Sequence, residues 1–397
     1  MLILRKRNPL KFSLTANFFD QYIHLNKLRL NGAGLLIISA ILFCSCNRNA
    51  AVKSKNSDSV LIDSIVLHNV GNFFGSLNFS HGVNAPIISY VSERRDMIYF
   101  VNYKVITDSL PLPPFLKNKK FNYFIDSAKM LFAHFNDENS IYKFKDTNLV
   151  TKYTYYSSSP VQIYLVSSFL KFEIINNTVL MHKVPNYRIF IDSERVKFFT
   201  LNLLSLFTLR NDSLVEKCNF SKFPKIYSTE FSNETYSYAT RLNKDSVAYL
   251  FSKENNVYMY DFNTNTEAKH PLQNIGANIL PAFKLDSMRY LSYTNKYELK
   301  CTKFLNILHD DISKKYIIIQ SLKVSDGIDN AGYMPIFEDV PMQINILDSS
   351  FSATSSIYFK NQSPDLLFSK SYYFNSKLYV PQFSKSARTV IYVYKAG

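Results

Sequence analysis

The sequence predicts an all-β chain arranged as a β-propeller of roughly six to eight blades. Short strands with alternating apolar and polar residues recur from residue 60 onwards, and they meet at polar turns. The hairpins recur roughly every 40–50 residues, a spacing typical of propeller blades. Repetition around a ring leaves only short strand edges exposed. A stack of two β-sandwiches is the alternative fold.

The clearest hairpin lies near the middle of the chain. Residues 246–251 form its first predicted strand, and residues 257–262 form the second after a polar turn. Because side chains alternate across a strand, Tyr258, Tyr260 and Phe262 are expected on one face. Two runs of aromatic and β-branched residues around a polar turn are typical of a β-hairpin.

The same pattern predicts strands along the rest of the body. They are expected at 86–91, 97–103, 161–166, 169–175, 188–191, 316–320, 366–368, 378–380 and 389–394. The strand near 390–393 is predicted to complete the blade that begins near 60–62, which would close the ring. Helical character is confined to 195–209, which is predicted to form either one helix or two buried strands.

Residues 1–46 have the pattern of a lipoprotein signal peptide. Six Lys and Arg residues and a single Asp precede an apolar core. This core is shorter than the roughly 20 apolar residues of a transmembrane helix. It ends at Ser45-Cys46, where a small residue precedes a cysteine that would receive a diacylglyceryl group and acyl chains such as palmitate. We therefore predict cleavage before Cys46 and lipidation of Cys46, with an uncut signal anchor as the alternative.

The residues after Cys46 predict a tether and a location. Residues 47–59 are polar and typical of a flexible linker, and residues 60–397 are expected to form a single domain. Asn47 is not the Asp that typically retains lipoproteins at the inner membrane, and no acidic cluster of the surface-export kind follows Cys46. We therefore predict an outer-membrane lipoprotein of the cell envelope with its body in the periplasm. Surface exposure stays open.

The charge of the chain does not indicate a nucleic-acid partner. The formal net charge is +15, to which the leader contributes +5, six cations minus Asp20. The abundance of Lys, Asn, Ile, Phe and Tyr is typical of an AT-rich coding genome and explains much of the remaining charge. Export and the lack of a Lys/Arg stripe argue against nucleic-acid binding. In the body, Cys218 and Cys301 either pair in an oxidising compartment or remain two thiols.

No metal, cofactor or catalytic site is predicted. The histidines of the body are not at ligand spacing. The most acidic segment combines His309-Asp310-Asp311 with Asp326 and Asp329, but it lacks the alternating carboxylates and the distal Glu of a calcium loop. We interpret it as solvated turns. There is no Gly-x-Ser-x-Gly elbow, and scarce Gly disfavours a phosphate-binding loop.

Two groups of tyrosines are candidates for a sugar-binding face. They are Tyr153, Tyr155 and Tyr156, and the pair Tyr372 and Tyr373. Aromatic rings present apolar faces that stack on sugars. Because Tyr and Phe are abundant throughout the chain, packing within and between strands is the preferred interpretation.

Asp-Ser followed by an aliphatic residue or Met recurs along the chain. This pattern resembles the acceptor motif for periplasmic O-glycosylation in Bacteroidetes, and Asp-Ser commonly supplies an accessible hydroxyl in a turn. The candidate sites are Ser59, Ser109 and Ser213. Turns that lead into strands are the alternative explanation.

The signal sequence, the length and two segments, 256–261 and 339–346, resemble an uncharacterised Bacteroidetes lipoprotein family of propeller-like proteins. The resemblance covers nearly the whole mature chain. It implies the envelope location and the propeller fold. It implies no activity and no catalytic residue, because the family has none established.

These expectations predict a lipid-anchored, exported binding or scaffold protein, for which enzymatic activity is not expected but stays open. Its partners would be the membrane, through the anchor, and envelope proteins or glycans. One alternative is a capture accessory for glycans or peptides at an outer-membrane uptake system. Another is a hydrolase with carboxylates at the central mouth of the propeller. A charged cluster there would favour the hydrolase, a flat aromatic rim would favour glycan capture, and an apolar side patch would favour a protein partner.

Overall fold

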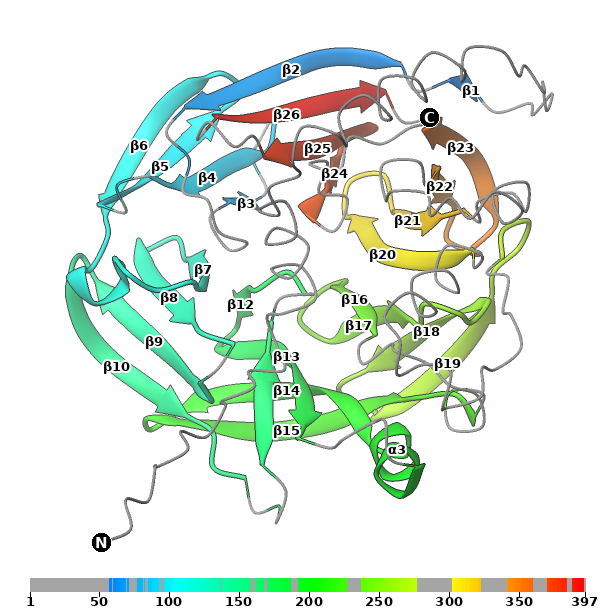
Figure 1. The fold of residues 1–397 in the computed structure, drawn as a ribbon, viewed down its shortest axis with the longest axis horizontal. Coiled ribbons are helices and arrows are strands. Elements are labelled where there is room, and N and C mark those ends of the chain that lie inside the picture. The colour runs from blue at the N-terminus through cyan, green and yellow to red at the C-terminus, as the bar shows by residue number, and fades with distance from the viewer. Residues whose placement is uncertain are drawn as a thin grey trace, which may run out of the picture. The chain divides into compact units, whose positions relative to one another are not determined.

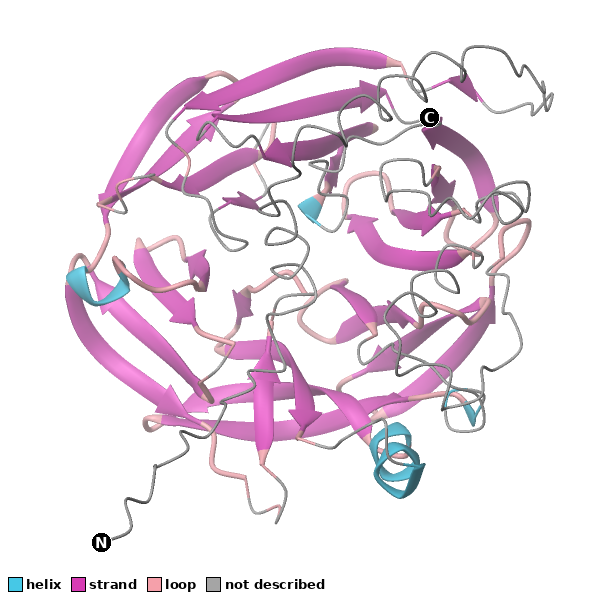
Figure 2. Cartoon of the chain, viewed as in Figure 1, coloured by secondary structure: helices cyan, strands magenta, loops and turns pink. Residues whose placement is uncertain are grey.

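Strands dominate the part of the chain that the computed structural model describes (Figure 2). The described residues are 57–58, 60–68, 70, 77–80, 82, 85–92, 94, 96–136, 138–157, 159, 162–167, 170–186, 192–225, 227, 237–276, 302–322, 341–359, 370–383 and 388–395. All of them belong to one unit of the chain, Asn56–Gly397.

The strands form five sheets, which follow one another around a common centre (Figure 1). The first sheet contains β3 (Leu77–Ser80), β4 (Ile87–Val91), β5 (Met97–Asn102) and β6 (Val105–Pro111). The second contains β7 (Asn122–Ile125), β8 (Met130–His134), β9 (Ser140–Lys145), β10 (Asn148–Thr154), β11 (Ile163–Val166), β12 (Ile174–Ile175), β13 (Thr178–Pro185), β14 (Asn202–Arg210) and β15 (Ser213–Lys222). The third contains β16 (Tyr238–Arg241), β17 (Ser246–Leu250), β18 (Asn256–Asp261) and β19 (Thr266–Pro271).

The last two sheets combine strands from both ends of the body. One contains β20 (Lys303–Asp310), β21 (Lys315–Ser321), β22 (Met342–Leu347), β23 (Ala353–Phe359) and β1 (Ser57–Asp58). The other contains β24 (Tyr372–Phe374), β25 (Lys377–Phe383), β26 (Arg388–Lys395) and β2 (Leu61–His68). Short helical segments are η2 (Pro114–Leu116) and α3 (Asp192–Phe199). The all-β prediction is confirmed, and the arrangement is propeller-like rather than a stack of two sandwiches.

The nine-stranded second sheet consists of two antiparallel runs, β7 to β10 and β11 to β15. Their strands pair at one position in the described residues, where Thr154 in β10 lies parallel to Ser213 in β15. The two runs also share a hydrophobic cluster, to which Ile141 of the first run and Phe207 of the second belong. They therefore pack against each other as neighbouring sheets do.

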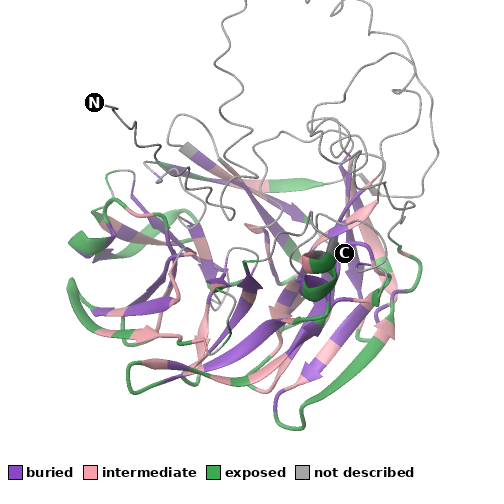
Figure 3. Ribbon diagram, turned by 60° about the horizontal axis from the view of Figure 1, so that its bottom comes forward, coloured by how far each residue is buried: buried purple, intermediate pink, exposed green. Residues whose placement is uncertain are grey.

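Hydrophobic clusters fill the spaces between successive sheets. In one of them, Val91 and Ile98 of the first sheet pack with Leu131 and Phe144 of the next. Burial is concentrated where the sheets face one another, and the outermost strands are more exposed (Figure 3). Large aromatic and branched side chains on both faces of the strands lose apolar surface to water in this packing, and that burial is the main stabilising contribution to such a fold.

The two ends of the body meet in one sheet. β26 pairs antiparallel with β2, and Ile65 lies opposite Ile391 in the register. Both side chains are buried. The prediction that the final strand completes the sheet begun near residues 60–62 is confirmed, because β26 pairs with β2.

The middle hairpin has the predicted faces. Tyr258 and Tyr260 of β18, with Phe262 just after it, belong to one hydrophobic cluster. Val257 and Met259 belong to, or pack against, a different cluster on the other side of the sheet. Because both faces of β18 contact a neighbouring sheet, apolar residues occupy both positions of the alternation.

Two segments differ from the expectation. Residues 195–209 form neither one helix nor two strands: α3 ends at Phe199, and β14 begins at Asn202. The predicted strand 169–175 is reduced to β12, because Leu170 forms a parallel bridge with Ala239 of β16 and the chain leaves the edge of β13. The predicted strands 188–191 and 366–368 lie outside the described residues.

Candidate functional site

A pocket lies where the innermost strands of the sheets converge. Its cavity volume is about 250 Å³, and residues of β3, β7, β12, β16, β20 and β24 contribute to its wall. The lining residues are 77–79, 122–123, 170–173, 175, 239–244, 306–311 and 370–373. Small-molecule sites favour concave positions of this kind, where several elements meet.

Lys171 and Glu173 form an ion pair in this pocket. Nζ of Lys171 lies 2.8 Å from Oε2 of Glu173, and the two side chains are 44% and 15% exposed. Burial opposes the positive charge of Lys171, but Glu173, Tyr372 and Asp311 together outweigh it, so the pKa of Lys171 is raised. A ligand can therefore reach both side chains, although that of Glu173 is largely removed from solvent.

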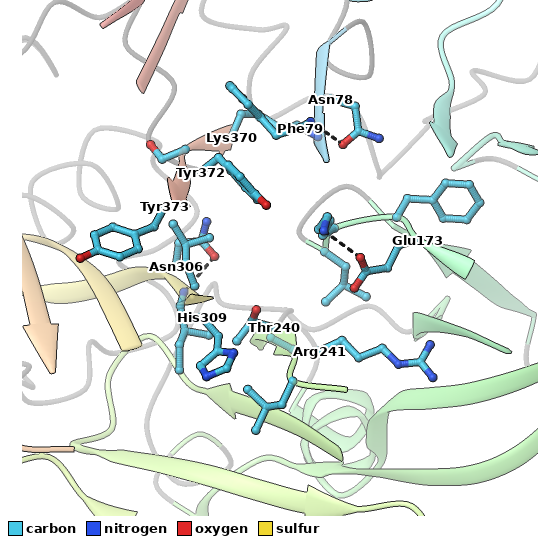
Figure 4. Close-up of a pocket in the computed structure, with 18 of the residues that line it drawn as sticks. Asn78, Phe79, Glu173, Thr240, Arg241, Asn306, His309, Lys370, Tyr372 and Tyr373 are labelled. Atoms are coloured by element: carbon cyan, nitrogen blue, oxygen red, sulfur yellow. Dashed lines mark hydrogen bonds and ion pairs between the residues drawn. The ribbon is translucent and has the colours of Figure 1, made fainter. Parts of the chain in front are cut away.

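Tyr372 stands beside this ion pair. Its ring stacks on Phe79 with centroids 5.4 Å apart, and the ammonium of Lys171 lies 5.8 Å from its ring centre. Figure 4 shows the Tyr372 hydroxyl directed towards the open centre of the pocket. Burial raises the pKa of Tyr372, and the carboxylates of Glu173, Asp310 and Asp311 add to the effect against Lys171. The phenol thus stays protonated and can donate or accept a hydrogen bond.

Arg241 lines the pocket, but its guanidinium is hydrogen-bonded to neighbouring strands and turns. Its guanidinium donates to the carbonyl oxygen and the Oγ1 of Thr178, at 3.1 and 2.7 Å. It also donates to the carbonyl oxygens of Asn243 and Lys244, at 3.1 and 3.3 Å. Figure 4 shows the side chain directed away from the pocket centre. Arg241 therefore joins β16 to β13 rather than facing a ligand.

The end of β20 contributes the His309-Asp310-Asp311 segment. Asp310 is only 3% exposed, and its Oδ2 accepts hydrogen bonds from the amide and the hydroxyl of Ser313, at 3.2 and 2.5 Å. Asp311 is exposed, and its Oδ1 lies 3.1 Å from Nδ1 of His309. Burial lowers the pKa of His309, which favours the neutral imidazole. The solvated-turn interpretation fits Asp311 but is wrong for Asp310, whose carboxylate is buried because it closes the turn.

Lys370 and Ser371 approach the pocket from the start of β24. Burial lowers the pKa of Lys370 to about 8. Ser371 is 5% exposed, and its Oγ has no hydrogen-bond partner among the described residues. A buried hydroxyl without a partner carries a desolvation penalty of about 1–3 kcal/mol.

The predicted aromatic candidates fall into two groups. Tyr153 and Tyr155 pack against the cluster between β7–β10 and β11–β15, and Tyr156 is 78% exposed. Tyr372 and Tyr373 do reach the pocket, but Tyr373 is 2% exposed and points away from Tyr372 (Figure 4). The packing interpretation is confirmed for Tyr153, Tyr155 and Tyr373, and the described lining residues form no flat aromatic rim.

The proposed modification sites are spread over the body. Ser109 lies exposed in the outer strand β6, and its amide donates to Oδ1 of Asp108 at 2.8 Å. Ser213 begins β15 and is half-buried, with its hydroxyl 3.4 Å from the carbonyl oxygen of Asn211. Cys46 and Ser59 lie outside the described residues.

No group of three or more His, Cys, Asp and Glu side chains in the described part of the chain is arranged to hold a metal ion. Asp326 and Asp329 lie outside that part, as does Cys301. Cys218 is a free, half-buried thiol. Among the described residues, no helix has the length and apolar character needed to cross a membrane.

The sequence analysis missed five charged residues of the pocket, which are Lys171, Glu173, Arg241, Lys244 and Lys370. A signal was present for the first two, because both interrupt the apolar segment 169–175 at positions that share one side of an extended chain. Lys370 had no such signal, because only the packing of the last sheet against the others brings it to the pocket.

Comparison with known proteins supports the fold. No family model matches the sequence, and no curated protein matches it. A solved structure of a DUF4221 family member from Bacteroides vulgatus is similar with a TM-score of 0.63 and 10% identity, over 85% of this chain and 98% of that one. Virginiamycin B lyase from Staphylococcus aureus has a TM-score of 0.39 and 11% identity, over 83% and 99% of the two chains. The β-propeller domain of Cps50 (Swd1) from Myceliophteria thermophila has a TM-score of 0.40 and 6% identity, over 85% and 100%.

Proposed function

We propose that this protein is a lipid-anchored binding protein of the bacterial cell envelope, which holds a small polar ligand in the central pocket of a six-bladed propeller. The observation that carries the proposal is the convergence of Lys171, Glu173, Lys370 and Tyr372 on one cavity of about 250 Å³. Charged side chains are rarely gathered in a partly buried space without a function, because desolvating them is costly.

The pattern of strands supports six blades. Six strands contribute residues to the pocket wall, namely β3, β7, β12, β16, β20 and β24. Five of them begin a run of successive antiparallel strands, and β12 pairs with β13 at the edge of the sixth run. Six hydrophobic clusters lie between consecutive runs. On this count the nine-stranded sheet is two blades that touch at the pair of Thr154 and Ser213.

The proposed envelope location is supported by the sequence alone. The signal peptide over residues 1–46 and lipidation of Cys46 would tether the body to the outer membrane, with the periplasm as its compartment. O-glycosylation at Ser59, Ser109 or Ser213 would be a further consequence of export. Exposure of Ser109 on β6 makes it the most accessible of the described candidates.

A hydrolase is the second candidate, because charged groups do converge on the pocket. Carboxylate catalysis needs one acid that is protonated and one that is free to act as a base or nucleophile. Glu173 is paired with Lys171, and Asp310 holds its turn through Ser313. Because both carboxylates are already held by these contacts, we favour binding over hydrolysis.

Protease treatment of intact and lysed cells, with a Cys46→Ala strain beside the wild type, tests the location. The expected result is degradation only after lysis, and release of the Cys46→Ala protein from membranes. Degradation in intact cells would instead place the body at the surface. Membrane fractionation that is unchanged by Cys46→Ala would contradict the lipid anchor.

Thermal-shift screening of the mature protein against sugars, oligosaccharides, amino acids and short peptides tests binding. At least one compound is expected to raise the melting temperature, and Lys171→Met should abolish that shift. Lys183→Met is the matched control, because Lys183 forms an ion pair with Glu216 at 2.6 Å outside the pocket. Absence of any shift, or an equal shift in both variants, would contradict a binding role for the pocket. Product release from any compound in the same panel would favour the hydrolase.

A further inference from the structure

We infer that the body rests on the phospholipid surface through one exposed apolar face, which we call the membrane face. It is formed by residues 60–62 at the start of β2, and by residues 103–106 in the turn between β5 and β6 and the start of β6. The inference rests on the proposed lipid anchor and adds the surface that the anchor brings against the bilayer. It is carried by the exposure of these residues, by their continuity and by their place beside the tether.

The membrane face gathers exposed apolar side chains. Six of the 15 large hydrophobic side chains that are exposed in the described part of the chain lie in it. They are Val60 at 54%, Leu61 at 51%, Ile62 at 45%, Tyr103 at 51%, Val105 at 66% and Ile106 at 55% exposure. Monomeric proteins rarely expose a large contiguous apolar patch, and such patches mark contact with a protein or a membrane.

Asp63 joins the two segments of the membrane face. Its carboxylate accepts hydrogen bonds from the Tyr103 hydroxyl at 2.5 Å and from Nζ of Lys104 at 2.7 Å. β2 and β6 are the outermost strands of their sheets, and Figure 1 shows them as neighbours on the outer edge. The ammonium of Lys104 balances the Asp63 carboxylate, so this contact adds no net negative charge to the face.

The local structure places apolar residues at unusual positions. The register of β2 passes from Leu61 to Asp63, so Ile62 has no opposite residue in β26. An irregularity of this kind leaves the extra residue unpaired and bends the strand. Tyr103 has a φ of 59° in its hairpin turn, a conformation that is uncommon for a bulky residue. Apolar side chains thus occupy an outer edge and a hairpin turn, where charged residues, Asn or Gly are usual.

The polar residues beside the face match a phospholipid surface. The amide of Lys395 donates to the carbonyl oxygen of Val60 at 3.0 Å, and Lys395 lies opposite Lys377 in the register. Both lysines are exposed. The ammonium of Lys104 lies 5.1 Å from the centre of the Tyr103 ring. Tyrosines are enriched where proteins meet the bilayer interface, and lysines there are attracted to anionic headgroups. This combination favours a lipid surface over an apolar protein partner.

The attachment point of the body holds this face towards the bilayer. The first described residue, Ser57, pairs with Ile357 of β23 and follows Cys46 by 11 residues. A chain of that length spans at most about 40 Å. A compact domain of about 340 residues has a radius of gyration of about 20 Å and is therefore roughly 50 Å across. Because the tether is shorter than such a domain is wide, the side that carries residues 60–62 stays close to the lipid.

Single tryptophans test the inference, because the chain contains no Trp. Leu61→Trp and Val105→Trp place the probe in the membrane face. Leu149→Trp is the matched control, because Leu149 is 55% exposed in β10 of the second sheet. Each lipidated mature protein is reconstituted into vesicles of phosphatidylethanolamine and phosphatidylglycerol, with and without brominated acyl chains, which quench tryptophan on contact. Quenching is expected to be at least twofold stronger at positions 61 and 105 than at position 149.

Flotation of the same samples on a density gradient separates the outcomes. If the lipidated proteins do not float with the vesicles, the anchor and the inference are both wrong. If they float but positions 61 and 105 are quenched no more than position 149, the membrane face is wrong while the anchor stands. A blue-shifted emission at 61 and 105 that depends on protein concentration and resists the brominated lipid would assign the face to a second copy of the chain and overturn the inference. Urea unfolding midpoints verify that all three variants fold.

Discussion

Tyr372 stacks on Phe79 with ring centroids 5.4 Å apart and ring planes 5° apart. Phe79 lies in β3 of the first sheet and Tyr372 in β24 of the last, so the stack joins the innermost strands from the two ends of the body. The same tyrosine directs its hydroxyl into the pocket (Figure 4). One side chain thus contributes both to the packing between the first and last sheets and to the wall of the pocket.

The stack predicts a large loss of stability when Phe79 is truncated. Phe79→Ala should lower the free energy of unfolding by about 3–5 kcal/mol, because a buried ring is replaced by a cavity. Tyr156→Ala is the control, because Tyr156 is 78% exposed and its loss should change stability by less than about 0.5 kcal/mol. Urea unfolding measures both. Similar values for the two variants would show that the stack contributes little.

The pairing of β2 with β26 predicts a difference between adjacent residues. Ile65 is 1% exposed and Val66 is 37% exposed on the opposite face of the same strand. Ile65→Ala should cost about 2–5 kcal/mol, because its methyl groups leave a cavity between sheets. Val66→Ala should cost less than about 1 kcal/mol. Equal unfolding midpoints in urea would mean that this strand is not part of the cooperative core.

Asp63 predicts a component of acid sensitivity. Lys104 and Tyr103 hydrogen-bond to its carboxylate and lower its pKa from 3.8 to about 2. Because the folded pKa lies below the unfolded one, the stabilisation is present above pH 4 and is lost as the pH falls towards 2. Lys104 is 47% exposed, so solvent screening limits the effect to at most about 1 kcal/mol.

Comparing Asp63→Asn with the wild type at several pH values measures that contribution. The wild type should be the more stable protein at pH 6, and the difference should disappear near pH 2. A difference that is the same at both values would show that the Asp63 charge is not responsible. Asp146→Asn serves as the control, because Asp146 is exposed in a turn.

The buried His182 predicts a loss of stability at moderately acidic pH. Its Nε2 lies 2.8 Å from the carbonyl oxygen of Ser237, and burial lowers its pKa from 6.5 to about 4. Between these values the unfolded chain binds one more proton at this site, so stability falls as the pH drops from 6.5 to 4. The contribution is about 1.4 kcal/mol per pH unit.

A His182→Gln variant isolates this effect. The stability of the wild type relative to the variant should decline steadily from pH 6.5 to 4, when both are followed by urea unfolding. Replacing the exposed His68 in the same way should leave the pH profile unchanged. A constant difference between the wild type and His182→Gln across this range would contradict the predicted neutral state of His182. His134, whose pKa burial lowers to about 3, should behave in the same direction.

The sequence was sufficient where the signal was local. Alternation in the segment 257–262 predicts β18 and its two faces, because side chains in a strand point to opposite sides whatever the sheet contacts. It was insufficient at 195–209, where α3 is followed directly by β14. A short apolar run fits a buried helix and a buried strand equally well, and only its neighbours decide.

The pocket shows the same division. Lys171 and Glu173 are two residues apart, so their proximity is encoded locally. Their proximity to Tyr372 is not, because Lys171 and Glu173 lie just before β12 whereas Tyr372 lies in β24, which is distant along the chain. Charge and residue type alone also do not distinguish Arg241, which is occupied by Thr178, from Lys171, which remains accessible.

The sequence by itself determined the all-β class, most of the individual strands and the prediction that the two ends of the body meet. Period-two alternation and turn chemistry act over a few residues, and that range is sufficient for these features. Only the tertiary structure decided which six strands face the pocket and which charges they bring there. That choice depends on the packing of each sheet against its neighbours, and the residues that set it are far apart in the chain.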